Sequence, residues 1–329
     1  LPMVIFTGNP GETGAYENQR IRILPLLGDD GLNLVTGIRA FLHEVDKRHV
    51  PVKVADRSEL DLFGQALSIG ITELHIVGGL HPSLPFSYYT EMIRELKAVD
   101  ERLQLKCFTA IEILHLAWLA KKPMPEVLAE LKSLGLDSLT GGGAEIFRRE
   151  VRSRIARGKE TAEEYLDVHR TWHTLGGRST CTMLFGHLET LGDRVDHMRQ
   201  LRGLQDETGG FTGFIPLPYQ PDNNEIPVEH SPTGFDMLRT IAVARLYLDN
   251  FDHIKAYWVM MGEETASIAL NFGASDLDGT IGEERIAHAA KAASPVGLAR
   301  ARMLRLIGDA GKTPVERDAL YNEIHVYDS

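Results

Sequence analysis

The segment GLDSLTGGGAEIFRREVR (residues 135–152) joins a short apolar strand to three consecutive glycines and the predicted start of a helix. Gly141, Gly142 and Gly143 lack a Cβ atom, so their backbone can turn sharply and approach a ligand closely. We expect Glu145 in the first turn of the helix, where it would meet unpaired N–H groups and a ligand's hydroxyl or amine. A plain strand-to-helix turn usually needs one glycine. Three in a row therefore favour a loop that faces a ligand.

Strands and helices alternate on both sides of this segment, and helices of about 12 residues between strands of about 5 predict βα units with a parallel sheet. The expected strands are Glu73–Val77, Leu105–Thr109, Leu136–Leu139, Ser179–Leu184, Phe211–Leu217 and Ile254–Met260, and the expected helices are Leu60–Ser68, Phe86–Val99, Pro125–Leu134, Thr161–Leu175, Asp193–Glu207 and Thr233–Asp249. Because no linker interrupts these units, we expect a partial or complete parallel β/α barrel rather than two open sheets.

The loops at the C-terminal ends of barrel strands are where such folds bind ligands. Five of these expected strand ends are rich in glycine and polar residues, namely 78–82, 109–112, 140–145, 185–189 and 218–221. Glu112, Glu145 and Glu189 supply three acids there, and His81 and His187 supply two imidazoles. Each of these residues taken singly fits an ordinary solvated loop, but their gathering at one end favours a polar mouth for a zwitterionic or sugar-bearing ligand. A zinc hydrolase is disfavoured, because no strand end carries a tight pair of histidines.

Composition narrows the class of protein further. The 329 residues carry a formal net charge of −11 without a block of Lys or Arg, which disfavours nucleic acid as a partner. We find no apolar run long enough for a membrane span and no signal peptide. Cys107 and Cys181 lie far apart, which is typical of a reducing cytoplasm. We expect both to be core residues inside strands. His169 and His173 share one helix face, and we expect a surface or packing role for them.

From about residue 70 onward the chain resembles the aminofutalosine synthases of the menaquinone futalosine pathway, which belong to the radical S-adenosylmethionine (radical SAM) superfamily. The segments that carry the resemblance are ELHIVGGLHPSLP (73–85), FTAIEILH (108–115), LGLDSLTGGGAEIF (134–147), TMLFGHLETLGDRVD (182–196), LQDETGGFTGFIPLPYQP (204–221), RTIAVARLYLDNFDHIKAYWVMMG (239–262), DLDGTIGEE (276–284) and PVERDALYN (314–322). Dehypoxanthine futalosine cyclases and the second radical half-reaction of deazaflavin synthesis share much of this pattern. Residues 253–262 and the ERDALYN tail look most like aminofutalosine synthase.

The resemblance implies S-adenosylmethionine as cosubstrate, a [4Fe–4S] cluster, and a one-electron reductant such as flavodoxin or ferredoxin. The implied reaction adds a 5′-deoxyadenosyl radical to the enol-ether double bond of 3-[(1-carboxyvinyl)oxy]benzoate, and rearrangement with loss of carbon dioxide gives aminofutalosine. The implied cofactor-binding residues are Gly78, Gly79, His81, Gly141, Gly142, Gly143, Glu145 and Glu189, and the implied substrate-binding residues are Glu112, Arg152, His187 and Tyr219. Arg152 suits this role because a guanidinium pairs a carboxylate through two parallel hydrogen bonds. No catalytic residue is implied.

One part of the chain departs from this family. Its members carry Cys-x-x-x-Cys-x-x-Cys after the first barrel strand, where three thiolates bind three irons of the cluster. This sequence lacks the motif: Gly11–Tyr16 resembles the loop that follows the cysteines, but residues 1–6 stand where the cysteines should be. We therefore interpret residues 1–58 as an atypical N-terminal segment and 59–329 as a radical SAM-like barrel with a C-terminal helical extension. Two hypotheses follow, an enzyme scaffold with an altered or incomplete N-terminal segment, or a cluster-less homologue that binds a nucleotide.

Overall fold

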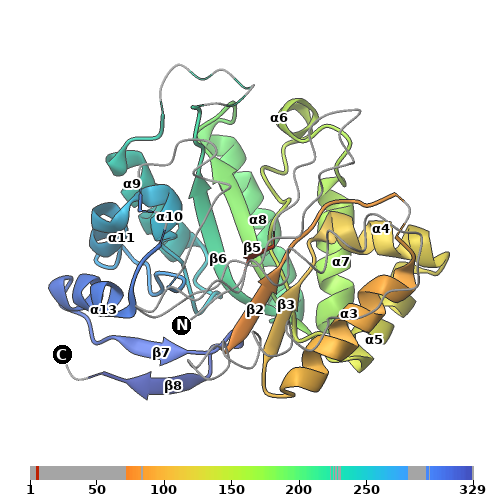
Figure 1. Ribbon diagram of the computed structural model, residues 1–329. Coiled ribbons are helices and arrows are strands. Elements are labelled where there is room, and N and C mark those ends of the chain that lie inside the picture. Colours follow the sequence, from red (N-terminus) through yellow and green to blue (C-terminus); the bar gives the residue numbers. More distant parts are fainter. Residues whose placement is uncertain are drawn as a thin grey trace.

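Parallel strands form the centre of the computed structural model, which describes residues 5–6, 72–82, 84–222, 224, 226, 228, 231–280, 294–295 and 297–327 (Figure 1). The strands lie side by side in the order in which they occur in the chain. They are β1 (Ile5–Phe6), β2 (Glu73–Ile76), β3 (Gln104–Cys107), β4 (Ser138–Leu139), β5 (Arg178–Phe185) and β6 (Phe211–Pro218). Parallel bridges from Phe214 to Ile254 and from Lys255 to Asp276 extend the array past β6. This order confirms the expected parallel β/α barrel architecture.

Helices alternate with these strands and cover the sheet, with α3, α4, α5 and α7 on one side of Figure 1 and α9, α10, α11 and α13 on the other. Their bounds are α3 (Phe86–Val99), α4 (Ala110–Ala120), α5 (Met124–Ser133), α6 (Arg149–Ile155), α7 (Ala162–Thr174), α8 (Leu191–Thr208), α9 (Gly234–Tyr247), α10 (Trp258–Met261), α11 (Glu263–Ala269) and α13 (Arg300–Asp309). A two-stranded antiparallel sheet of β7 (Val315–Arg317) and β8 (Glu323–Val326) lies at the lower edge of the view. None of the helices in the described ranges is long and apolar enough to cross a membrane.

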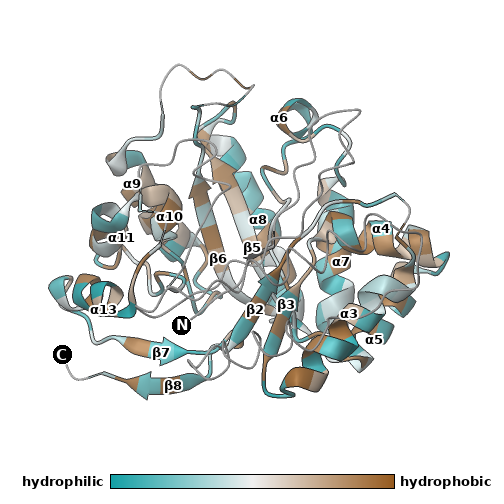
Figure 2. Cartoon of the chain, viewed as in Figure 1, coloured by the Kyte–Doolittle hydropathy of each residue, from teal (hydrophilic) through white to brown (hydrophobic). Residues whose placement is uncertain are grey.

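The two faces of the strands meet different surroundings, because side chains alternate along a strand. Leu74 and Leu105 are fully buried among apolar side chains of the main core. Glu73, which precedes Leu74, and Lys106, which follows Leu105, are also buried, and the Lys106 Nζ lies 3.7 Å from Glu73 Oε1. Figure 2 shows this alternation as adjacent hydrophobic and hydrophilic bands on β2 and β3. The start of the barrel interior is therefore lined by charged groups.

Residues 317–321, which we call the C-terminal plug, close this charged end. Arg317 pairs with Asp276 and lies 4.0 Å from the ring centroid of Tyr321. The Gln104 amide, at the first residue of β3, donates to Asp318 Oδ2 at 2.8 Å. The plug thus brings counter-charges and hydrogen bonds from the last part of the chain to the beginnings of the strands.

Most of the expected elements occur in the structure within a few residues. The capping box expected at the start of α7 is present, since the Thr161 hydroxyl accepts from the Glu164 N–H and the Glu164 carboxylate accepts from the Thr161 N–H. Cys107 and Cys181 are buried in β3 and β5, as predicted. The packing role of two helical histidines is also confirmed: His169 Nδ1 and His173 Nε2 lie 2.9 and 2.8 Å from the Ser179 hydroxyl. The helix expected at 60–68 lies outside the described residues, and the division near residue 58 stays a prediction.

Three expectations about local structure are wrong. The expected strand 254–260 is reduced to bridges at Ile254 and Lys255, and Trp258 begins the short helix α10. An apolar run buried on all sides has no periodicity that separates strand from helix. Residues 110–112, interpreted as a loop, form the first turn of α4. The helix after the glycines begins only at Arg149, so Glu145 is not in its first turn.

Candidate active site

The loop after β2 is fastened to the start of α4 by Glu112. The Gly78 N–H donates to Glu112 Oε1 at 2.7 Å, and the N–H and hydroxyl of Thr109 donate to Oε2 at 2.8 and 2.7 Å. Burial raises the pKa of Glu112 to about 7, although these hydrogen bonds act in the opposite direction. Glu112 is 6% exposed, and both oxygens of its carboxylate accept hydrogen bonds from the protein. It therefore joins the ends of β2 and β3, and its predicted contact with substrate stays a prediction.

The triple-glycine loop follows β4 and presses against β5. A Cβ built on Gly141 would lie 2.6 Å from the Cys181 Cα, so no side chain fits there. The hydroxyls of Tyr165 and Thr182 donate to the Gly141 carbonyl at 2.9 and 2.7 Å. Gly143 has a φ of +91°, which L residues with side chains rarely adopt. The glycines thus serve close packing as well as backbone conformation.

Glu145 lies in the loop between β4 and α6 with a φ of +46°, rather than in a helix. Its carbonyl accepts from the Leu184 N–H of β5 at 2.7 Å, and this bond holds the loop away from a helical course. Its carboxylate pairs with Lys159 Nζ at 2.9 Å. Burial is the largest single influence and raises the pKa of Glu145, but the combined effect of the Lys159 charge, its hydrogen bond and the charge of Arg152 holds that pKa below its ordinary value. Glu145 is therefore an ionised acid at the end of β4.

Lys159 is a candidate that sequence reasoning missed. Its side chain is 35% exposed. Its charge acts to lower the pKa of Glu145, and it also opposes the rise that burial causes in the pKa of Glu112 at the neighbouring strand end. Lys159 precedes the Thr161 N-cap of α7. In a parallel βα unit the helix begins at the edge of the sheet where the preceding strand ends. A cation just before the N-cap of α7 therefore could have been predicted from the sequence to lie at the strand ends.

Arg152 lies on α6 and is 6% exposed. Its Nη1 and Nη2 donate to the carbonyls of Ala144 and Gly143 at 2.6 and 3.0 Å, and its Nε donates to the Glu160 carbonyl at 2.7 Å. Its guanidinium also lies 3.3 Å from the carboxylate of Glu160. The role in substrate binding expected for Arg152 stays a prediction, while the contacts that exist lie within the protein.

The loop after β5 is built around Glu189, whose side chain is fully buried. Its carboxylate accepts from the N–H groups of Gly186 and His187 at 2.6 and 2.9 Å, and from Arg194 Nε at 2.8 Å. His187 Nδ1 lies 3.1 Å from Glu189 Oε2, yet burial holds the pKa of His187 below its ordinary value. The imidazole of His187 and the buried Glu189 carboxyl group therefore close this end of β5.

The remaining predicted residues stand at the two margins of this arrangement. The His81 carbonyl lies 2.9 Å from His115 Nε2, and the His81 Nδ1 accepts from the Leu84 N–H at 3.1 Å. Tyr219 follows β6, and its ring meets that of His187 edge-on, with centroids 6.0 Å apart. The structure thus places every predicted site residue except Arg152, which lies on α6, at the ends of β2 to β6 or in the residues that directly follow them. Whether each one binds cofactor or substrate stays a prediction.

The residues of this chain do not fit the three-thiolate cluster that the resemblance implies. The whole sequence contains two cysteines, and burial raises the pKa of both thiols well above the ordinary value. Both are 0% exposed in the apolar core. Within the described ranges no group of three or more His, Cys, Asp or Glu side chains is placed to hold a metal ion. We therefore derive no step of chemistry through a cluster on this chain.

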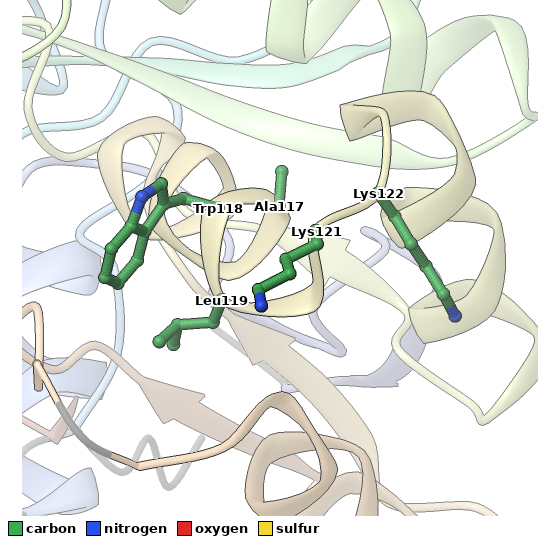
Figure 3. Close-up of a pocket in the computed structure, with 5 residues that line it drawn as sticks. All are labelled: Ala117, Trp118, Leu119, Lys121 and Lys122. Carbon is green, nitrogen blue, oxygen red and sulfur yellow. The ribbon is translucent and has the colours of Figure 1, made fainter.

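A surface pocket of about 570 Å³ lies elsewhere, at the far end of α4 from Glu112. Its lining is Ala117, Trp118, Leu119, Lys121 and Lys122 (Figure 3). Trp118 is 67% exposed and stacks on His115. Because helix α4 runs away from the strand ends, this pocket is separate from the candidate site.

Comparisons with known proteins agree with the fold. The radical SAM superfamily model matches residues 45–201, and the CofH/MqnC C-terminal region model matches residues 208–328. Among solved structures, methylornithine synthase superimposes with a TM-score of 0.55 at 13% identity, covering 82% of this chain and 77% of that chain, which shows the fold alone.

Curated relatives are much closer in sequence. The aminodeoxyfutalosine synthase of Thermus thermophilus is 52% identical over 263 residues, which are 79% of this chain and 71% of the relative. That of Streptomyces coelicolor is 46% identical, over 78% of this chain and 70% of its own length. The 5-amino-6-(D-ribitylamino)uracil–L-tyrosine 4-hydroxyphenyl transferase of Methanopyrus kandleri reaches 39%, over 85% and 76% respectively, so the sibling group is more distant. The chain belongs to the radical SAM superfamily and, within it, to the family of the aminodeoxyfutalosine synthases.

Proposed function

We propose that this chain binds S-adenosylmethionine and a carboxylate-bearing aromatic enol ether at the strand ends, and that it serves the aminodeoxyfutalosine synthase reaction. The observation that carries the proposal is the 52% identity with an aminodeoxyfutalosine synthase over 79% of the chain. The siblings match at lower identity. In this superfamily the cosubstrate carries the reactive chemistry, and the protein supplies binding, orientation and exclusion of water.

The contacts at the strand ends support particular roles in binding. The missing Cβ atoms of Gly141 and Gly143 face Cys181 and Glu160 of the protein itself, so on this proposal the glycine loops contact the nucleotide through backbone N–H and C=O groups. Glu145 offers carboxylate oxygens to ribose hydroxyls or to the amine of the methionine moiety. A lysine ammonium has three donor positions, and Lys159 uses one of them for Glu145, so it can also meet a ligand carboxylate. Both ligands carry carboxylates, which makes this cation the most accessible anchor that we assign at the mouth.

The two buried cysteines favour a second candidate function, a ligand-binding protein that does not begin the radical reaction itself. On the first proposal, three thiolates come from a form of the protein whose N-terminal segment carries them. Its one-electron donor, such as flavodoxin or ferredoxin, would act on that form. A cytoplasmic location likewise stays a proposal.

Iron loading separates the two candidates. We expect this chain, treated anaerobically with ferrous iron, sulfide and reductant, to retain no stable iron and no brown colour, because neither thiol is accessible. A variant with Cys-x-x-x-Cys-x-x-Cys placed before Gly11 should take up about four irons per chain, as the cluster type requires. It should then consume S-adenosylmethionine, as measured by mass spectrometry of 5′-deoxyadenosine products. If the iron-loaded variant never converts the enol ether, the synthase proposal is wrong; if the unaltered chain holds four irons, our assignment of its cysteines is wrong.

Substitution of Lys159 tests the binding site directly. We expect Lys159→Met to weaken S-adenosylmethionine binding roughly tenfold to a hundredfold, because a charge-assisted hydrogen bond to the ligand is lost and the main cause that lowers the pKa of buried Glu145 is removed. Isothermal titration calorimetry on the full chain measures this change. Arg157→Met is the matched control, since Arg157 is exposed in the same turn and the substitution removes the same charge. Equal affinities for the two variants would contradict the role of Lys159.

A further inference from the structure

One guanidinium fixes the shape of the triple-glycine loop. Arg152 donates to the Ala144, Gly143 and Glu160 carbonyls at 2.6, 3.0 and 2.7 Å. The donors of a guanidinium are coplanar and point in fixed directions, so three such bonds define where their acceptors lie relative to one another. Arg152 therefore sets the position of the loop after β4 against the residue that precedes the α7 cap.

The loop needs support of this kind. Gly143 and Glu145 both have positive φ values, +91° and +46°, and the second is costly for a residue with a side chain. Such conformations persist only where the surrounding structure imposes them. The Leu184 N–H holds the Glu145 carbonyl from the β5 side at 2.7 Å. Arg152 holds the two preceding carbonyls from the α6 side.

Glu160 is the charged partner of Arg152 in this arrangement. Its side chain is fully buried, with Oε1 3.3 Å from Arg152 Nη2, and neither carboxylate oxygen has a hydrogen-bond partner among the described residues. Oε1 also lies 2.9 Å from where a Cβ on Gly143 would be. Burial raises the pKa of Glu160 to about 7, against the charge of Arg152. Burying a carboxylate without hydrogen bonds costs stability. We therefore interpret Glu160 as the counter-charge of Arg152. Its Oε1 also occupies the space that a side chain at position 143 would need.

We propose that Arg152 and Glu160 are positioning residues that hold Gly143–Glu145 in the backbone conformation that presents Glu145 to the nucleotide cosubstrate. The presentation to cosubstrate rests on the function proposed above, whereas the control of the loop does not. The two residues act through the loop and do not themselves touch a ligand. This role is an alternative to the ligand-carboxylate contact that the sequence suggested for Arg152, which stays a prediction.

The Leu184 amide reports on the loop, because its acceptor is the Glu145 carbonyl while other β5 amides bond to neighbouring strands. We would measure hydrogen exchange of single β5 amides by NMR on the full chain. Arg152→Lys keeps the charge but cannot span three carbonyls, and Glu160→Gln keeps the shape but leaves Arg152 without a counter-charge. Arg154→Lys is the matched control, because Arg154 is exposed on the same helix.

In Arg152→Lys we expect Leu184 to exchange about tenfold faster, with other β5 amides within about twofold of the unaltered chain. Glu160→Gln should give a smaller rise at the same amide, and Arg154→Lys none. Unchanged exchange at Leu184 in both Arg152→Lys and Glu160→Gln, or a uniform rise along β5, would overturn the proposal. Calorimetry with S-adenosylmethionine keeps the two proposals distinct. No heat with the unaltered chain contradicts the proposed function, and the Leu184 exchange still decides the role of Arg152.

Discussion

Gly141→Ala is expected to abolish S-adenosylmethionine binding and to lower the free energy of unfolding by about 2–4 kcal/mol, among the largest effects of any single methyl group in this chain. The added Cβ would lie 2.6 Å from the Cys181 Cα and 2.8 Å from its backbone N and C atoms. Backbone in the middle of β5 cannot move aside as a flexible side chain would. The loop must move instead, and it then loses the bonds from Tyr165 and Thr182 to the Gly141 carbonyl.

Urea denaturation and calorimetric titration measure the two consequences. Gly203→Ala is the matched control, because Gly203 is exposed within α8 and a Cβ there would meet no atom within 4 Å. That substitution should stabilise the chain by about 0.5–1 kcal/mol through helix propensity. Should Gly141→Ala bind and unfold like the unaltered protein, the close packing of the loop on β5 would be refuted.

Lys255→Met is expected to destabilise the chain by about 3–5 kcal/mol, because it leaves Asp278 buried without its nearest counter-charge. The side chains of Lys255 and Asp278 are 1% and 8% exposed and are hydrogen-bonded to each other. Burial is the largest single influence and lowers the pKa of Lys255, but the electrostatic interactions with Asp278, Tyr321 and Asp276 together raise it above the ordinary value. Methionine replaces the length of the lysine side chain but not its charge.

The double variant Lys255→Met/Asp278→Asn checks the cause. Removing both charges should recover part of the lost stability, since the penalty comes from the unpaired carboxylate more than from the missing pair. Lys312→Met is the control for the loss of one exposed positive charge and should change stability by less than about 0.5 kcal/mol. If the loss of stability in the double variant equals the sum of the losses in Lys255→Met and in Asp278→Asn alone, the pairing is contradicted.

The order of elements could be predicted from the sequence because local signals were strong. The Thr161 and Glu164 capping box marked the start of α7, and glycines after α8 marked its end. The stretch from Trp258 to Met261 failed because a run that is apolar on every face gives neither a period of two nor one of 3.6. The helix α4 was missed because its first turn carries the polar residues of a capping box, which look like loop residues.

The candidate site was predictable in its location but not in its internal contacts. Glycines and acids at the strand ends indicated the mouth, since parallel strands end at one edge of a sheet. Nothing in the sequence shows that the Arg152 guanidinium turns to carbonyls of its own loop, because that contact depends on the positive φ angles of Gly143 and Glu145. Side-chain partners across the fold are set by tertiary packing, which local patterns do not encode.

The C-terminal plug also bears on how the protein is made. A ribosome adds Asp276 to the chain 41 residues before Arg317, its partner, and Gln104 precedes its partner Asp318 by 214 residues. While the nascent chain is shorter than this, Asp276 lacks its direct ion-pair partner and the strand-start end of the barrel lacks its cover. Contacts between such distant residues form slowly. The charged end of the barrel is therefore expected to close late in folding, when the plug docks.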